Sequence, residues 1–316
     1  TASLVVANLT VQNGVVANYG GGIRTNSALT LTGVTVYSNT AQIGGGLYAE
    51  GATTYAAALT MTGAQFLTNT ASSGPGGGMM VFGRLTIADS QFDGNHAEWG
   101  DGGGIYATGP ITFTDVAFTN NSVAQSGASG GAVYANSGPA INIIAALTNV
   151  TVTANTAVET AGGILLNGFG HTMIDSGHFE ANRCTSNMCT GGGLLLSDGS
   201  ATLSATQFIS DEAGYQGGGL STIDVITITQ GLFERNVVRQ SGGMGGGLAA
   251  GGTQVMAVVS DTHFISNTAG TGGGVRFFGP AQLIGGAFAG NTGDAVYAAR
   301  SLAITPTLPY TYTGNF

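Results

Sequence analysis

The sequence predicts an all-β fold: a single-domain, right-handed parallel β-helix of about 11 coils with three strands per coil. Two motifs recur along the 316 residues, a Gly-Gly-Gly-aliphatic motif every 21 to 32 residues and a Phe-x-x-Asn motif that precedes most of its copies. Because no stretch has helical periodicity, this repetition indicates small β-units that bury apolar surface by stacking. The aliphatic residues of the first motif are Ile23, Leu47, Met79, Ile105, Val133, Ile164, Leu194, Leu220, Leu248, Val275 and Val296.

Each unit contains three extended segments. A short strand follows the glycines, as at 105–107, then comes an alternating run, as at 29–32, and the third segment ends at the Phe of Phe-x-x-Asn. Alternation with period two places aliphatic side chains on one face and Thr on the other. Stacking the coils about 4.8 Å apart would align the aliphatic residues in one internal ladder and the phenylalanines in another. The aromatic ladder is Phe66, Phe92, Phe118, Phe179, Phe208, Phe233, Phe264 and Phe288.

The Asn of each Phe-x-x-Asn motif is predicted to form a third ladder. We expect this residue to take the left-handed backbone of a sharp corner and to donate its amide to the next coil. Asp211 stands where one Asn is expected and interrupts the ladder, because a carboxylate cannot donate. The predicted ladder is Asn39, Asn69, Asn95, Asn121, Asn155, Asn182, Asn236, Asn267 and Asn291.

The repeat assigns residues 1–300 to the β-helix and leaves 301–316 as a C-terminal tail that docks on the helix end or on a neighbouring subunit. Because the chain begins with Thr1 rather than Met, we expect a processed product or a fragment. No apolar run reaches the length of about 18 residues needed for a membrane span.

The charge balance disfavours anionic partners. The net charge is −9, the chain has seven Arg and no Lys, and no basic cluster exists, which argues against nucleic acid and anionic membranes as partners. Cys184 and Cys189 are the only cysteines, and we expect a local disulfide, which implies an oxidising compartment. Two free thiols are the alternative, whereas a metal site would need further ligands.

The paired repeats resemble those of the polymorphic outer-membrane-protein family of bacterial surface adhesins. Gly130-Gly131-Ala132-Val133 together with Phe118-x-x-Asn121 is the most similar unit, and the likeness extends over some ten coils. The resemblance implies a secreted passenger domain that adheres to cells and self-associates, located outside the cell or at the cell surface.

No catalytic, cofactor-binding or metal-binding residue is assigned. A hydrolase would need two or three facing carboxylates, and Asp198 and Asp224 are the nearest candidates, because each lies four residues after its aliphatic marker. Surface-turn aspartates are the alternative. At another corner, Glu98, Trp99 and Asp101 form a candidate glycan contact, because an exposed Trp beside carboxylates can stack on a sugar. A partly buried Trp that covers the corner is the competing interpretation.

The residue after each internal aliphatic residue must point outward. Six successive members are aromatic or large and apolar, which predicts an exposed stripe that contacts another chain or a ligand. Long neighbouring turns that fold over the stripe are the alternative. These members are Tyr48, Met80, Tyr106, Tyr134, Leu165 and Leu195.

We therefore expect a non-enzymatic extracellular structural or adhesive protein without a cofactor that assembles into filaments or a surface layer. Its expected partners are other copies of itself, through residues 1–15 and 301–316, and a cell-surface glycan or receptor. A carbohydrate-binding or polysaccharide-cleaving β-helix is the alternative function.

Overall fold

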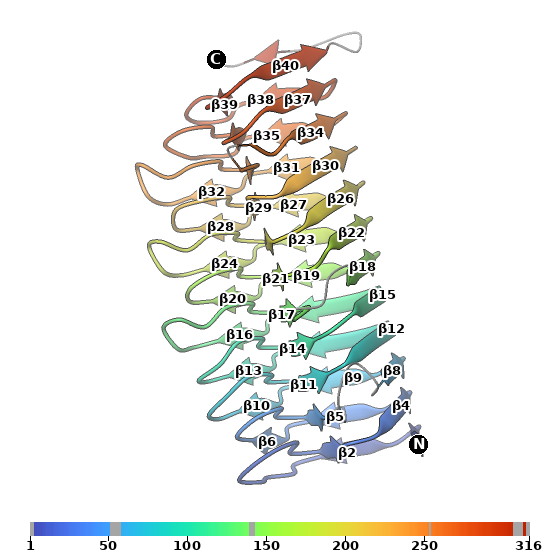
Figure 1. Ribbon diagram of the computed structural model, residues 1–316. Coiled ribbons are helices and arrows are strands. Elements are labelled where there is room, and N and C mark those ends of the chain that lie inside the picture. The colour runs from blue at the N-terminus through green and yellow to red at the C-terminus, as the bar shows by residue number, and fades with distance from the viewer. Residues whose placement is uncertain (1–2, 51–57, 139–142, 253, 306–311, 314–316) are drawn as a thin grey trace.

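The computed structural model describes residues 3–50, 58–138, 143–252, 254–305 and 312–313. These residues contain strands and no helix, and so none of them could cross a membrane as a helix. The strands pair in parallel in three sheets, and the chain winds through the sheets coil by coil (Figure 1). This arrangement confirms the predicted single-domain parallel β-helix.

The large sheet has 22 strands. These strands form two stacks along the rod, here called the first and the second face of the large sheet. Its first face consists of β1 (Ser3–Ala7), β4 (Ala28–Thr32), β8 (Ala58–Thr62), β18 (Ile144–Thr148), β22 (His171–Asp175), β26 (Ser200–Ser204), β30 (Val225–Thr229), β34 (Ala257–Ser260), β37 (Ala281–Ile284) and β40 (Leu302–Thr305). Its second face consists of β2 (Thr10–Gln12), β5 (Thr35–Tyr37), β9 (Gln65–Leu67), β19 (Thr151–Thr153), β23 (His178–Glu180), β27 (Gln207–Ile209), β31 (Leu232–Glu234), β35 (His263–Ile265), β38 (Ala287–Ala289) and β41 (Tyr312–Thr313). The longer β12 (Arg84–Asp93) and β15 (Ile111–Thr119) belong to both faces.

Two smaller sheets complete the coil. The eight-stranded sheet contains β6 (Thr40–Ala41), β10 (Thr70–Ala71), β13 (His96–Ala97), β16 (Ser122–Val123), β20 (Thr156–Ala157), β24 (Arg183–Cys184), β28 (Glu212–Ala213) and β32 (Val237–Val238). The eleven-stranded sheet contains β3 (Ile23–Thr25), β7 (Leu47–Ala49), β11 (Met79–Phe82), β14 (Ile105–Thr108), β17 (Val133–Asn136), β21 (Ile164–Asn167), β25 (Leu194–Ser197), β29 (Leu220–Thr222), β33 (Leu248–Ala250), β36 (Val275–Phe277) and β39 (Val296–Ala298).

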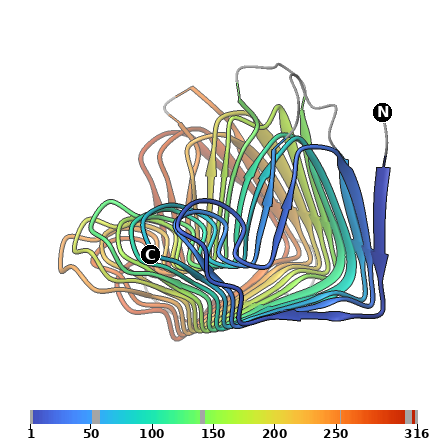
Figure 2. The same ribbon diagram turned by 90° about the horizontal axis from the view of Figure 1, so that it is seen from below.

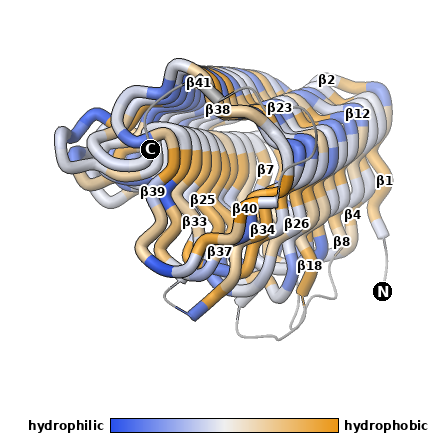
Figure 3. The backbone as a smooth tube through the Cα atoms, turned by 90° about the horizontal axis from the view of Figure 1, so that it is seen from above, coloured by the Kyte–Doolittle hydropathy of each residue, from blue (hydrophilic) through white to orange (hydrophobic). Residues whose placement is uncertain are grey.

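Both internal apolar ladders form as predicted. Ile105, Val133 and Ile164 face one another in register, and all three are fully buried. Six pairs of neighbouring Phe rings stack with centroids 4.8–5.1 Å apart. Val152 replaces an aromatic ring between Phe118 and Phe179. Hydrophobic residues therefore run in continuous bands along the rod (Figure 3).

Each coil turns beside the eleven-stranded sheet at a pair of glycines. Gly102 has a φ of 70°, which favours glycine, and a Cβ on Gly103 would lie 2.4 Å from the carbonyl oxygen of Gly131 in the next coil. The glycine motif therefore allows the backbones of successive coils to approach closely.

The asparagine ladder forms, and Asn95 shows its geometry. The backbone N–H and the Nδ2 of Asn95 donate to Oδ1 of Asn121, at 3.1 and 2.9 Å, and Nδ2 also donates to the carbonyl of Phe66 at 2.8 Å. The pattern repeats from Asn39 to Asn291. The prediction that the ladder Asn itself adopts the left-handed backbone conformation is wrong. The positive φ belongs to the residue before it. The Asn side chain points inward to reach the next amide, and so the corner falls on its neighbour. These neighbours include Ser38, Thr68, Gly94, Asn120, Ala154 and Ala181.

Asp211 interrupts the ladder as expected. Its Oδ1 accepts from the N–H and Nδ2 of Asn182, at 2.8 and 2.9 Å, but its Oδ2 is buried without a hydrogen bond. Burial raises the pKa of this fully buried carboxyl well above its ordinary value of 3.8, although the bonds from Asn182 act in the opposite direction. Burial therefore favours the protonated form of Asp211 relative to an exposed aspartate.

Asp211→Asn is expected to stabilise the protein at pH 7 by about 1–3 kcal/mol, because an amide can make the missing donation. The pKa of the Asp211 carboxyl is higher in the folded than in the unfolded protein. Its contribution to the stability of the fold is therefore fully present below pH 3.8 and is lost as pH rises through the folded pKa. Denaturation at pH 4 and pH 7 should show a smaller gain at pH 4. Asp175→Asn, at an exposed carboxyl, is the control. A gain that did not change with pH would contradict this account.

The described part of the predicted tail, 301–316, lies on the end of the helix. Within 301–316, β40 pairs in register with β37, and β41 pairs with β38. The described part of this segment therefore continues the large sheet, because its residues repeat the strand pattern of the preceding coils.

Candidate ligand-binding face on the eleven-stranded sheet

The outer face of the eleven-stranded sheet carries a continuous row of side chains, here called the outer row. Each member follows an inward aliphatic residue and pairs in register with the equivalent residue of the next coil. The row is Arg24, Tyr48, Met80, Tyr106, Tyr134, Leu165, Leu195, Ser221, Ala249, Arg276 and Tyr297.

The outer row is more covered than the sequence suggested. Tyr48, Met80 and Leu165 are buried, with 6–8% of their surface exposed, whereas Tyr106, Tyr134 and Leu195 are partly buried. The stripe is therefore not continuously exposed, because three of its six members are buried. Neighbouring side chains provide some of the cover, and loops lie on both sides of this sheet (Figure 2).

A second row, here called the flanking row, runs beside the first and was not predicted. Each member lies five residues before the outer-row residue of its coil. Successive members are joined by a β-bridge, or the residue after one member donates its N–H to the carbonyl of the next member. A search for side chains at this fixed spacing could have found it. The row is Tyr19, Ile43, Pro75, Asp101, Ser129, Thr160, Thr190, Gln216, Met244 and Thr271.

Side chains of the two rows contact each other within a coil. The guanidinium of Arg24 lies 5.1 Å from the ring centroid of Tyr19. Further along the rod, Nε2 of Gln216 donates to Oγ of Ser221 at 3.2 Å. The two rows therefore form one surface with both aromatic and polar groups.

The middle of this surface combines aromatic rings with a carboxylate. The rings of Tyr106 and Tyr134 are stacked, with centroids 5.1 Å apart and an interplanar angle of 1°. Beside them, Oδ1 of Asp101 accepts a hydrogen bond from the backbone N–H of Ser129 at 2.8 Å. Burial raises the pKa of the Asp101 carboxyl, and burial together with the nearby Asp101 charge raises the pKa of both tyrosines. A ligand here would meet a partly desolvated acid and two phenols.

Two of the predicted glycan-contact residues lie on the adjoining loop. Glu98 and Trp99 are exposed, and 60% of the Trp99 surface is accessible. Trp99 is therefore not a cover for the corner, whereas the carboxylate of Asp101 is near enough to the tyrosine pair to add to burial in raising the pKa of both rings. The three residues enlarge the polar and aromatic surface at this level of the rod.

Comparison with protein-family models, curated proteins and solved structures found no match to this chain. Its function must therefore be inferred from the residues of the described surface.

A second polar cluster contains the two aspartates singled out in the sequence. Asp224 accepts hydrogen bonds from the backbone N–H groups of Gly199 and Asp198, and its carboxyl interacts with that of Asp198. Burial, followed by the Asp198 charge, raises the pKa of Asp224 to about 6, against the effect of the two N–H groups. The structure therefore brings this pair together. No group of three or more His, Cys, Asp or Glu that could hold a metal occurs in the described ranges.

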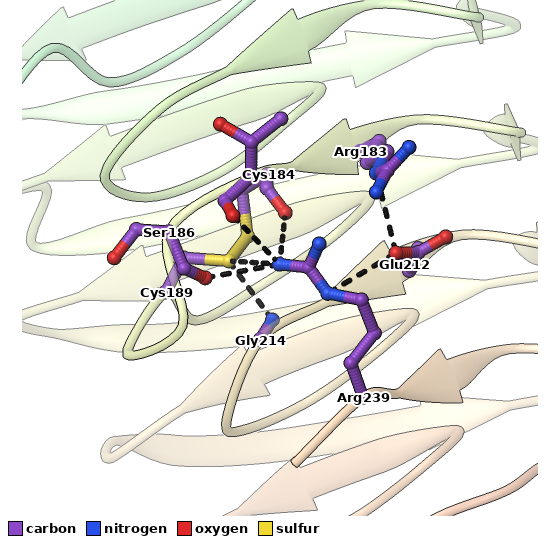
Figure 4. A network of polar contacts seen from close by, with 8 residues as sticks. Arg183, Cys184, Ser186, Cys189, Glu212, Gly214 and Arg239 are labelled. Carbon is purple, nitrogen blue, oxygen red and sulfur yellow. Dashed lines mark hydrogen bonds and ion pairs between the residues drawn. A yellow bond between two sulfur atoms is a disulfide. The ribbon is translucent and has the colours of Figure 1, made fainter. Parts of the chain in front are cut away.

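The predicted disulfide joins Cys184 to Cys189 and belongs to a third polar cluster (Figure 4). One Nη of Arg239 donates to the carbonyls of Cys184, Thr185 and Ser186, each at 3.0 Å. The guanidinium also pairs with Glu212, which in turn pairs with Arg183. The disulfide loop and Arg239 thus tie three successive coils together, and the cluster has an evident structural role.

Proposed function

We propose that this chain is a non-catalytic, extracellular adhesive β-helix that binds its partner through the outer and flanking rows. The observation that carries the proposal is the partly buried Tyr106–Tyr134 pair beside Asp101 and the exposed Trp99. Aromatic residues are enriched at the centres of binding interfaces, where they combine apolar area with a polar group. A stiff rod with internal ladders would present such a face in a fixed geometry.

Two further features support an extracellular adhesive role. The Cys184–Cys189 disulfide favours an oxidising compartment. The glycine and Phe-x-x-Asn repeats resemble those of the polymorphic outer-membrane-protein adhesins, which also suggests a secreted passenger-like rod. Partial burial of the outer row limits the area available to a flat partner. Binding would therefore concentrate on the less buried central part of the row.

Cell adhesion through this face can be tested with beads coated with the purified protein. The double variant Tyr106→Ser/Tyr134→Ser is expected to lower bead binding to cultured cells at least about tenfold, equivalent to 1.4 kcal/mol. Tyr37→Ser is the matched control, since Tyr37 is an exposed tyrosine on β5 of the large sheet. Unchanged adhesion of a correctly folded double variant would refute the proposal, as would equal loss with Tyr37→Ser.

Polysaccharide cleavage is the second candidate function, and the Asp198–Asp224 pair favours it. Two neighbouring carboxyls, of which Asp224 has a raised pKa, are suited to acid and base roles in glycoside hydrolysis. If this function were correct, purified protein would shorten polysaccharides and Asp224→Asn would abolish the activity. Cleavage that persists in Asp224→Asn would exclude this pair.

Stacking of copies end to end is the proposed mode of self-association. The first and last coils expose apolar side chains, with 65% of Val5 and 48% of Ile304 accessible. Strand edges at such ends can pair with another chain. Electron microscopy of concentrated protein should show filaments, whereas uniformly monomeric rods would count against stacking.

A further inference from the structure

Both ends of the outer face hold a guanidinium group of the chain itself. Arg24 lies over Tyr19 at one end. At the other end, Arg276 lies 4.4 Å from the Tyr297 ring centroid, and its Nη1 donates to Oγ1 of Thr271 at 3.1 Å. At the first end Tyr19 is both the aromatic ring and the flanking-row residue, whereas at the other end Tyr297 supplies the ring and Thr271 the flanking-row contact. Both arrangements accommodate arginine.

The centre of the face has comparable groups but no cation. Tyr106 and Tyr134 supply the rings, and Asp101 occupies the flanking row. None of the ion pairs among the described residues involves Asp101, and the chain has no Lys that could reach it. Asp101 can neutralise a guest cation in addition to what Tyr19 and Thr271 offer at the ends. The central site is therefore at least as suitable for a guanidinium as the two occupied ones.

The surrounding charge favours a cationic guest. The chain carries a net charge of −9, and the exposed Glu98 lies on the same loop as Asp101. One carboxylate oxygen of Asp101 is engaged by the N–H of Ser129, and the other makes no hydrogen bond within the described residues. A guanidinium can donate to that oxygen while its plane contacts a ring, whereas an ammonium cannot do both equally well.

We propose that Tyr106, Tyr134 and Asp101 form a binding subsite for an arginine side chain of a partner protein. Trp99 and Glu98 border this subsite on the adjoining loop and add an aromatic face and a second negative charge. The inference rests on the proposed adhesive function, and it identifies the class of partner as a protein segment that exposes arginine. Arg24 and Arg276, both members of the outer row, already place a guanidinium against an aromatic ring on this face, so the guest would extend an existing pattern.

Peptide titration tests the subsite directly. A tetra-arginine peptide is added to the whole protein at low salt, and binding is followed by calorimetry and by the emission of Trp99, the single Trp of the chain. Asp101→Asn is expected to raise the Kd at least about tenfold, because the charge-assisted bond is lost while the acceptor for Ser129 remains. A tetra-citrulline peptide, similar in shape but uncharged, is expected to bind at least tenfold more weakly as well.

Asp175→Asn is the matched control, because it removes one negative charge from an exposed site on β22 of the large sheet. Equal weakening by Asp175→Asn, or equal binding of the citrulline peptide, would overturn the subsite. No binding of tetra-arginine would also overturn it, and a neutral glycan that shifts Trp99 emission instead would identify a different ligand class.

If cell adhesion needs the two tyrosines but arginine does not bind, only the subsite is wrong. If arginine binds through Asp101 but cell adhesion is unchanged when the two tyrosines are replaced, only the adhesive function is wrong.

Discussion

Phe233→Ala is expected to lower the free energy of unfolding by about 3–5 kcal/mol. The Phe233 ring is fully buried and stacks on Phe208 and on Phe264, with centroids 4.8 and 4.9 Å away. Truncation removes both stacking contacts and leaves a cavity that the rigid neighbouring coils cannot fill. Chemical denaturation followed by circular dichroism would measure the loss.

Met188→Ala provides the control for Phe233. Met188 is 64% exposed on the disulfide loop, so its truncation should change stability by no more than about 0.5 kcal/mol. A Phe233→Ala protein as stable as this control would show that the aromatic ladder contributes little.

Asn95→Ala is expected to lower the free energy of unfolding by a similar amount, about 3–5 kcal/mol, for a different reason. The Asn95 side chain donates to the carbonyl of Phe66, and its Oδ1 accepts from both the N–H and the Nδ2 of Asn69. Alanine leaves several of these buried groups without partners, and each such group costs about 1–3 kcal/mol. The midpoint and slope of urea denaturation would give the change.

Asn187→Ala is the corresponding control, because Asn187 is exposed and lies outside the ladder. The loss of stability in Asn95→Ala should also be greatest close to the substituted residue. Hydrogen exchange should therefore quicken most at the amide of Asn69, which has lost its acceptor. Uniform exchange throughout the rod would argue that the ladder acts only as a global stabiliser.

The sequence predicted most of the fold because the repeat restricts each position to one environment. The register of Ile105 with Val133 and the stacking of Phe233 follow from motif spacing alone. The corner conformation was assigned one residue too late, because both Asn and its neighbour tolerate turns and only the inward direction of the Asn side chain separates them. The sequence assigned 301–316 to a tail because this segment lacks the glycine motif, although its strands at 302–305 and 312–313 pair with the preceding coil.

The candidate binding face was harder to predict. Alternation identifies Tyr106 and Tyr134 as outward, but it gives no information on the rings of Tyr19 and Phe82 that lie against Tyr48. The flanking row has no residue type in common, so no motif points to Asp101, and only its fixed spacing of five residues from Tyr106 could have identified it. The approach of Asp224 to Asp198 could be predicted, because both occupy equivalent places in adjacent coils.

The repeated glycine corner has a consequence for how the length of such a rod can change. Gly245-Gly246-Gly247 leads into Leu248, and the next corner leads from Gly274 into Val275 in the same register. Removing residues 248–274 would join Gly247 to Val275 and place Phe288 against Phe233, an aromatic contact of the kind already present. Each coil contacts mainly its two neighbours, so insertion or deletion of a whole coil leaves every other interface in place. Duplication within the gene could thus move a binding site along the rod without redesigning the scaffold that carries it.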